Sequence, residues 1–258
     1  MLLDFDDDGP GPVVILLHGF PLNRSMWKAQ MAKIGSLYRV IAPDLRGHGH
    51  TAAPDGVYSI DAMADDVLDL LNALQLKEPV VIGGLSMGGY IALSLVARHP
   101  ERVRALILMD TRAGADSTEA ALGREEMAKQ VETTRSTASV VQAMLPKLFS
   151  ETTRNFHSDR IVPVRHMMEK TPARAVAGAL RGMAARPDRT GDLARIQVPT
   201  LVLVGADDTI TPPAEARAMA QAIPGAQFEI IPNAGHLAPL ENPAASNAAI
   251  LRFLSSLP

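Results

Sequence analysis

The chain has 258 residues, of which 47% are hydrophobic and 21% charged, values that suit a globular protein of one domain, with or without an insertion. A formal net charge of −3, with arginines scattered among acids, excludes a basic surface for nucleic acid or anionic lipid. The apolar runs are too short to cross a bilayer, and the acidic start of the chain does not resemble a signal peptide. Because there is no cysteine, disulfides, thiol nucleophiles and thiolate metal sites are excluded. We therefore expect a cytoplasmic protein with no nucleic-acid or membrane partner, and the sequence favours no particular oligomeric state.

Continuous apolar runs recur along the chain and predict the strands of a parallel sheet that is covered on both faces. They lie at 13–17, 38–42, 80–82, 103–109, 200–204 and 228–231. Between them, apolar residues at helical spacing predict a helix over 60–74, and Asn242-Pro243 is typical of the start of a last helix. This alternation indicates an α/β fold.

The alternation is interrupted between residues 112 and 196, where no strand-like run appears. Helix-forming stretches occupy 118–134, 139–149, 162–169 and 172–185 instead. The pattern predicts a core domain of residues 1–111 and 197–258, with a helical insertion of residues 112–196 between two strands of the sheet. Methionines of the insertion, Met144 among them, either line a substrate pocket or pack the insertion onto the sheet, because methionine adapts to irregular apolar contacts.

One serine lies in a pattern that activates a nucleophile. An apolar run leads into Gly84-Leu85-Ser86-Met87-Gly88, and a helical pattern follows at once. A serine on a sharp strand-to-helix turn needs small neighbours two residues before and two after it, and Gly84 and Gly88 meet this need. Such a turn exposes the hydroxyl and directs free helix N–H groups toward it. The sequence therefore predicts Ser86 as the nucleophile.

A serine nucleophile requires a base, and the base requires an acid that orients it. His236 lies on a loop after a predicted strand, at the edge of the sheet where ligands bind in open α/β folds. Asp208 and Asp110 each follow a predicted strand, and both give the chain order Ser, Asp, His. Asp208 is the preferred acid, with Asp110 and Asp207 as alternatives.

Two backbone N–H groups are predicted to stabilise the negative oxygen that forms when a serine attacks a carbonyl group. One belongs to Met87, directly after the serine, and the other to Phe20, in the turn at 18–21. We expect Phe20, Trp27, Met87 and Met144 to contribute to an apolar pocket that binds the substrate and favours neutral acyl groups.

Taken together, these segments resemble the α/β-hydrolase superfamily over nearly the full chain. The matching residues are His18-Gly19-Phe20-Pro21, Asp44-Leu45-Arg46-Gly47-His48-Gly49, Gly84 to Gly88, Gly205-Ala206-Asp207-Asp208 and Gly235-His236. In that family a Gly-x-x-Asp pattern supplies the acid, so the resemblance favours Asp208. It also implies an α/β-hydrolase fold, a mostly parallel central sheet with helices on both faces, in which residues 112–196 form a helical cap over the active site.

Narrower similarities concern the Ser-Met-Gly-Gly sequence and residues 182–189, which are similar to carboxylesterases and to 3-oxoadipate enol-lactonase-like hydrolases. Family members usually carry two antiparallel strands before the strand that corresponds to 13–17. The few residues that precede that run here suffice for one strand and a turn, so we expect the first strand to be short or absent.

The resulting hypothesis is a serine hydrolase that cleaves small-molecule carboxylic esters or lactones with water, through an acyl-serine intermediate. The chemistry needs no cofactor, no cluster of acids and histidines has metal-ligand spacing, and the glycines around Ser86 do not follow the dinucleotide-binding pattern. The same three residues would also serve C–C bond hydrolysis, acyl transfer or perhydrolysis, and a slow-turnover ligand receptor is a further alternative.

Overall fold

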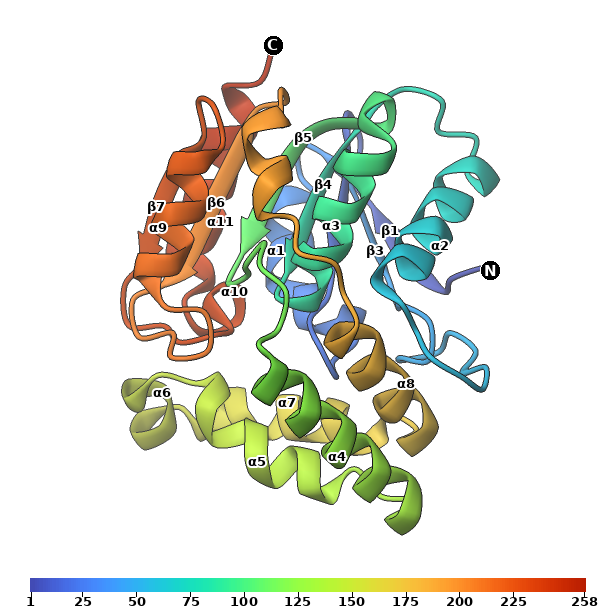
Figure 1. Cartoon of the computed structure of the whole chain (residues 1–258). Helices are drawn as coiled ribbons and strands as arrows, with labels where there is room; N and C mark the ends of the chain where they lie inside the picture. Colours follow the sequence, from blue (N-terminus) through green and yellow to red (C-terminus); the bar gives the residue numbers. More distant parts are fainter.

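The computed structural model describes all 258 residues and contains one seven-stranded sheet, in the order β1-β3-β2-β4-β5-β6-β7 (Figure 1). The strands are β1 (Phe5–Asp8), β2 (Val13–Leu17), β3 (Arg39–Pro43), β4 (Val80–Leu85), β5 (Val103–Met109), β6 (Thr200–Gly205) and β7 (Gln227–Ile231). All neighbouring pairs are parallel except β1 and β3, which are antiparallel. The predicted α/β-hydrolase fold is confirmed, and the apolar runs form its parallel strands.

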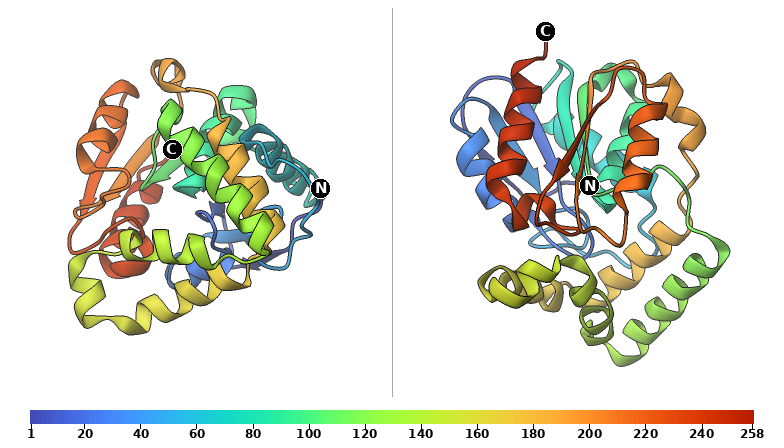
Figure 2. Two further views of the ribbon diagram at one scale, coloured as in Figure 1. Left: turned by 60° about the horizontal axis from the view of Figure 1, so that its bottom comes forward. Right: turned by 90° about the vertical axis from the view of Figure 1, so that its left-hand side faces the viewer.

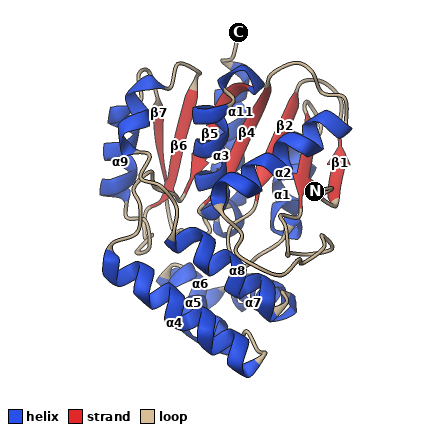
Figure 3. Cartoon of the chain, turned by 45° about the vertical axis from the view of Figure 1, so that its right-hand side comes forward, coloured by secondary structure: helices blue, strands red, loops and turns tan.

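Helices cover both faces of the sheet (Figure 3). On one face α1 (Lys28–Ile34) contacts α11 (Pro243–Ser255), and on the other α2 (Ile60–Ala73) contacts α3 (Met87–Arg98). α9 (Pro213–Ala222) lies on the face opposite α11, as the right-hand view of Figure 2 shows. Because helices cover the two faces, β4 and β6 are buried along their whole length, which explains their unbroken apolar sequences.

Five helices connect β5 to β6 and lie beyond the carboxyl ends of the strands (Figure 1). They are α4 (Thr118–Thr134), α5 (Ala138–Leu148), α6 (Glu151–Phe156), α7 (Ser158–Lys170) and α8 (Ala173–Ala184). The sequence did not predict α6, because this six-residue helix buries only Thr153 and so shows no apolar periodicity. Short helices complete the chain: η1 (Arg24–Trp27), η2 (Pro100–Arg102), η3 (Thr190–Arg195) and α10 (Ala238–Glu241).

One strand, β1, precedes the strand at the start of the parallel sheet. Its sequence is acidic rather than apolar, since it lies at the edge of the sheet and its last three residues are exposed. Arg39 of β3 pairs with Asp7 of β1 at 2.6 Å, so opposite charges stabilise this antiparallel pair. No helix of the chain is long and apolar enough to span a membrane.

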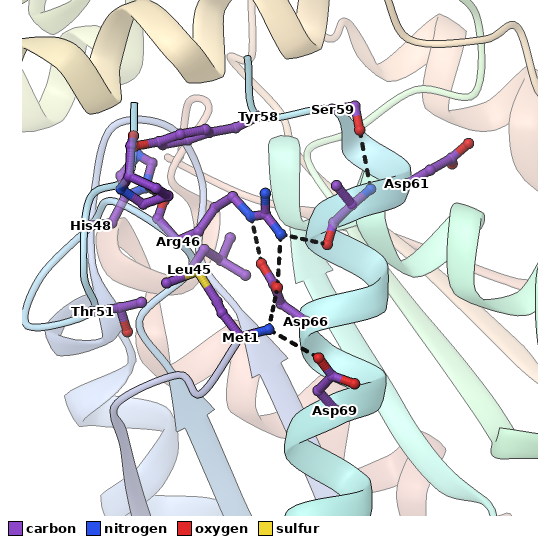
Figure 4. Close-up of polar contacts among 12 residues, drawn as sticks. Met1, Leu45, Arg46, His48, Thr51, Tyr58, Ser59, Asp61, Asp66 and Asp69 are labelled. Carbon is purple, nitrogen blue, oxygen red and sulfur yellow. Dashed lines mark hydrogen bonds and ion pairs between the residues drawn. The ribbon is translucent and has the colours of Figure 1, made fainter. Parts of the chain in front are cut away.

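The loop after β3 is tied to α2 by a buried ion pair (Figure 4). Asp66 is 2% exposed and accepts hydrogen bonds from Arg46 Nε at 2.5 Å and from the N-terminal ammonium of Met1 at 2.8 Å. The same loop carries His48, whose ring lies 5.2 Å from that of His18. The loop after β3 also meets the turn that follows β2 directly, since the N–H of Leu45 donates to His18 Nε2 at 3.0 Å.

Candidate active site

Ser86 occupies a strained turn between the end of β4 and the start of α3. Its φ angle is 52°, a left-handed value that a side chain such as serine adopts at a cost of about 1–3 kcal/mol. The turn is tight enough to require glycine at two positions. A Cβ added at Gly84 would overlap the backbone of Gly88, and one added at Gly88 would overlap the backbone of Leu17. Thr111 fixes the turn by donating from its hydroxyl to the Ser86 carbonyl at 2.8 Å. These contacts leave the Ser86 side chain only partly buried.

A chain of hydrogen-bond contacts runs from Ser86 to two buried side chains. Ser86 Oγ lies 2.9 Å from His236 Nε2, and His236 Nδ1 lies 2.8 Å from Asp208 Oδ2. His236 follows the end of β7 and Asp208 follows the end of β6, so the carboxyl edge of the sheet brings all three together. When Nδ1 donates to the carboxylate, Nε2 is free to accept the serine proton.

Asp208 is held as a charged carboxylate. Burial alone would raise its pKa, but hydrogen bonds and charge from His236 and hydrogen bonds from Thr211 bring the pKa below the usual value. Asp208 Oδ1 accepts from the N–H of Ile210 at 2.8 Å and of Thr211 at 3.0 Å, while the Thr211 hydroxyl donates to Oδ2 at 2.5 Å. Sequence reasoning did not single out Thr211, whose contact with Asp208 depends on the turn between them.

The two alternative acids take other positions. Asp110 Oδ1 accepts from Gly205 N–H at 2.8 Å and Oδ2 from Ala238 N–H at 3.3 Å, so its carboxyl group joins neighbouring backbone segments rather than the imidazole. Complete burial, with a further contribution from the charge of Asp208, raises the pKa of Asp110 well above its usual value. Asp207 is exposed, and only its backbone N–H is engaged, with Ala234 O at 2.9 Å.

The N–H groups of Phe20 and Met87 make no hydrogen bond within the chain. Met87 is the first residue of α3, where N–H groups have no helical partner. The turn that carries Phe20 packs against the nucleophile, since a Cβ added at Gly19 would lie 3.6 Å from Ser86 Cβ. Both free donors therefore lie in segments next to Ser86, as an oxyanion site requires.

Two histidines, His18 and His48, lie behind Phe20. Both are fully buried and uncharged at neutral pH. Burial lowers the pKa of His18 to about 4, and burial together with the nearby His18 lowers that of His48 to about 3. His18 Nδ1 donates to Gly19 O at 2.9 Å, which leaves Nε2 to accept from Leu45 N–H at 3.0 Å. The neutral His18 ring thus joins the turn after β2 to the loop after β3.

The residues predicted to line the substrate pocket differ in exposure. Phe20 is 5% exposed and Met87 is fully buried, so the main contribution of Met87 is its N–H group. Met144 is partly buried on α5. Trp27 is 0% exposed and its Nε1 has no hydrogen-bond partner. A side chain without accessible surface cannot touch a substrate in this conformation, which argues against the expected role of Trp27.

The structure also contains a surface cleft of about 650 Å³ that lies away from Ser86. Leu93 and Val96 of α3 form one wall, and residues 195–198, at the end of η3 and just after it, form the other. Arg189 in this cleft pairs with Asp61 at 2.9 Å and with Asp192 at 3.2 Å. No group of three or more His, Asp or Glu side chains has an arrangement that could hold a metal ion.

Comparison with known proteins agrees with the geometry. The model of the α/β-hydrolase fold family matches residues 12–243. The chain therefore belongs to the α/β-hydrolase family.

Individual relatives indicate which kind of hydrolase the chain is similar to. 3-Oxoadipate enol-lactonase 2 of Acinetobacter baylyi is 30% identical over 93% of this chain and 87% of its own length. A thermophilic esterase from Thermogutta terrifontis, solved with malate bound, is 45% identical, with a TM-score of 0.97 over 99% of this chain and 93% of that one. The enol-lactonase from Burkholderia xenovorans LB400 is 30% identical, with a TM-score of 0.91 over 98% and 96%. These relatives support the expected enzyme class, a carboxylic ester hydrolase of esterase or lactonase type.

Proposed function

We propose that this protein is a serine hydrolase that cleaves carboxylic esters or lactones through an acyl-enzyme on Ser86. The observation that carries the proposal is the continuous contact from Ser86 Oγ through His236 to Asp208, at 2.9 and 2.8 Å. It combines a nucleophile in a strained turn, a base within reach of its proton and an acid that holds the base in one tautomer.

In the first half of the reaction, Ser86 Oγ bonds to the carbonyl carbon while its proton passes to His236 Nε2. Asp208 stays ionised and stabilises the imidazolium. The carbonyl oxygen becomes negative and accepts hydrogen bonds from the N–H groups of Phe20 and Met87. When the carbon–oxygen bond to the alcohol breaks, Nε2 returns the proton to the leaving oxygen.

In the second half, a water molecule takes the place of the alcohol. His236 Nε2 removes one proton from the water as its oxygen attacks the acyl carbon, and the Ser86 Oγ–carbon bond then breaks. The proton returns to Oγ, and the carboxylic acid leaves. With a lactone, the alcohol and the acid are two ends of one released hydroxy acid, so the protein needs only water and a small-molecule substrate.

The helical insertion is proposed to act as a cap, so that residues 112–196 form one domain and residues 1–111 with 197–258 the other. Its helices lie beyond the carboxyl ends of the strands (Figure 1), and Ser86 directly follows the carboxyl end of β4. It contacts the core at separate points: Gly178 O accepts from Tyr58 N–H at 3.0 Å, and the Thr171 hydroxyl donates to Pro21 O at 2.9 Å. A cap in this position would shield the acyl-enzyme and select substrates.

For the substrate, the apolar side chain of Phe20, in the turn next to the nucleophile, favours neutral, apolar acyl groups. A panel of neutral esters, neutral lactones and charged dicarboxylate lactones tests this preference by kcat/KM. Higher values for the dicarboxylate lactones than for every neutral substrate would contradict it.

The test of the reaction itself is Ser86→Ala, assayed with p-nitrophenyl acetate and butyrate. Loss of a catalytic serine lowers kcat by about 10⁶-fold in a well-studied serine hydrolase, so we expect turnover to fall below detection. Ser94→Ala is the matched control, because Ser94 lies on the same helix and its hydroxyl bonds Asp61 at 2.5 Å, outside the site. Substantial ester turnover by folded Ser86→Ala would refute the proposal.

A further inference from the structure

Glu241 is a buried carboxylate to which the proposed mechanism gives no role. It is 1% exposed and ends the short helix α10. Its Oε1 accepts from the N–H of Gly235 at 2.7 Å, and its Oε2 accepts from the N–H of Ser150 at 2.8 Å. Each oxygen therefore serves one backbone donor, in bonds of the charge-assisted kind.

The two donors belong to different parts of the molecule. Gly235 directly precedes His236, whereas Ser150 is the N-cap residue of α6 in the helical insertion. The two segments also touch, because a Cβ added at Gly235 would lie 2.8 Å from Ser150 N and 2.9 Å from Phe149 C. Arg160 of α7 donates to the Glu241 carbonyl as well. Glu241 thus lies at a close contact between the insertion and the loop that holds the base.

From this geometry we propose that Glu241 is a positioning residue that couples the helical insertion to His236. The proposal rests on the proposed function, since it assigns Glu241 its role through the base. His236 must keep Nε2 within hydrogen-bond reach of Ser86 Oγ, and displacements of about 1 Å can reduce turnover by about 100-fold. Because Glu241 joins Gly235 to Ser150, a movement of the turn between α5 and α6 is transmitted to the imidazole.

The other side of the same loop has a different anchor. Ala238, two residues after His236, donates to Asp110 Oδ2 at 3.3 Å, and Asp110 belongs to the sheet domain. Asp110 therefore connects the loop to the core, and Glu241 connects it to the insertion. Of these two links, that of Glu241 connects the insertion to the base, and the Ser150 hydroxyl adds a longer contact of 3.5 Å to Asn233 O in the same loop.

Glu241→Gln tests the coupling with little change in volume. The amide oxygen can accept one of the two N–H groups, but the NH₂ group then faces the other, and two donors cannot bond. We expect kcat for p-nitrophenyl butyrate to fall 10- to 100-fold. KM should stay within about threefold, because Glu241 is buried and is not among the residues proposed to contact the substrate. The control is Glu229→Gln, which changes an exposed carboxylate on β7 that pairs with Arg252 at 2.7 Å, and its kcat should equal that of the native enzyme.

A second pair of variants approaches the link from the insertion. Ser150 has φ −59° and Phe149 is extended, so proline fits at position 150 and removes the N–H that bonds Glu241. Ser150→Ala removes the same hydroxyl but keeps the N–H. We expect Ser150→Pro to lower kcat as Glu241→Gln does and Ser150→Ala to leave it within twofold. The double variant Glu241→Gln/Ser150→Pro should lose much less than the product of the two effects.

Native kcat in folded Glu241→Gln, or equal kcat in Ser150→Pro and Ser150→Ala, would overturn the coupling and leave Glu241 with a structural role alone. The measurement separates this result from failure of the proposed function. If native enzyme hydrolyses p-nitrophenyl butyrate and loses this activity in Ser86→Ala, the function stands whatever the Glu241 variants do.

Discussion

Replacement of Asp208 by asparagine should reverse the tautomer of His236. In the native chain Oδ1 accepts two backbone N–H groups, from Ile210 and Thr211, at 2.8 and 3.0 Å. An asparagine at position 208 keeps both bonds only if its oxygen takes the place of Oδ1. Its NH₂ group then occupies the place of Oδ2, 2.8 Å from His236 Nδ1, and must donate to that nitrogen. The imidazole proton moves to Nε2, which can no longer accept the proton of Ser86.

The expected magnitude follows from this change of tautomer. An equivalent asparagine substitution in a serine protease lowers kcat by about 10⁴-fold, and we expect a loss of that order for Asp208→Asn. The unfolding temperature should fall modestly, because the Thr211 hydroxyl, which donates to Oδ2 at 2.5 Å in the native chain, loses this acceptor when the NH₂ group takes the place of Oδ2.

Steady-state hydrolysis of p-nitrophenyl butyrate and thermal unfolding measure the two quantities. Asp207→Asn is the control, since Asp207 is the exposed neighbour in the same turn, and it should retain native kcat. A loss of less than tenfold in folded Asp208→Asn would refute the reasoning about the tautomer.

Three further predictions concern stability. His48 is buried with its pKa lowered to about 3, so the unfolded chain binds a proton more readily than the folded one, and stability falls as pH drops below about 6.5. By pH 4 this effect amounts to roughly 3 kcal/mol, and His48→Asn should show a correspondingly weaker pH dependence in urea unfolding. Gly88→Ala should lower the free energy of unfolding by about 1–3 kcal/mol, because its Cβ would overlap the backbone at the end of β2. Asp116→Ala should cost about 3–5 kcal/mol, because it removes the carboxylate 2.7 Å from the buried Arg186 guanidinium and leaves that charge only neutral carbonyl acceptors, whereas Glu132→Ala at an exposed ion pair should cost less than about 1 kcal/mol.

Each of these three stability predictions can be contradicted by a specific measurement. Equal slopes of stability against pH for the native chain and His48→Asn would show that this histidine is not held neutral by burial. Unchanged stability in Gly88→Ala would mean that the turn can open to admit a methyl group. Similar losses in Asp116→Ala and Glu132→Ala would contradict the distinction between buried and exposed ion pairs.

Much of the fold could be predicted because the inner parallel strands, such as β4 and β6, are buried along their length and carry mainly apolar sequences. The strained turn was also visible, since Gly84 and Gly88 have to approach other backbone segments closely. Two elements lacked such signals. β1 is acidic because it lies at an edge, and α6 is a single short helix whose one buried residue is polar.

The candidate site was predictable to the extent that its residues follow strands at one edge of the sheet. Order along the chain could not separate Asp208 from Asp110, because both follow strands that end at that edge. Their hydrogen bonds distinguish them in the structure. The imidazole of His236 contacts the carboxylate of Asp208, whereas Asp110 accepts from the backbone N–H of Gly205 and makes no hydrogen bond with the imidazole. Glu241 escaped prediction because its role depends on Ser150, 91 residues away in the chain. The aromatic character of Trp27 does not reveal whether its side chain faces a pocket or the core, and in the structure the side chain is fully buried.

The central claim is that Ser86 attacks the substrate, and covalent trapping tests it most directly. The native enzyme is treated with a p-nitrophenyl phosphonate, and intact mass and peptide mapping locate the adduct. The account predicts one adduct per chain, on the peptide that contains Ser86, with loss of esterase activity in step with labelling. Esterase activity that survives complete labelling of Ser86, or inactivation by an adduct on another residue, would contradict it.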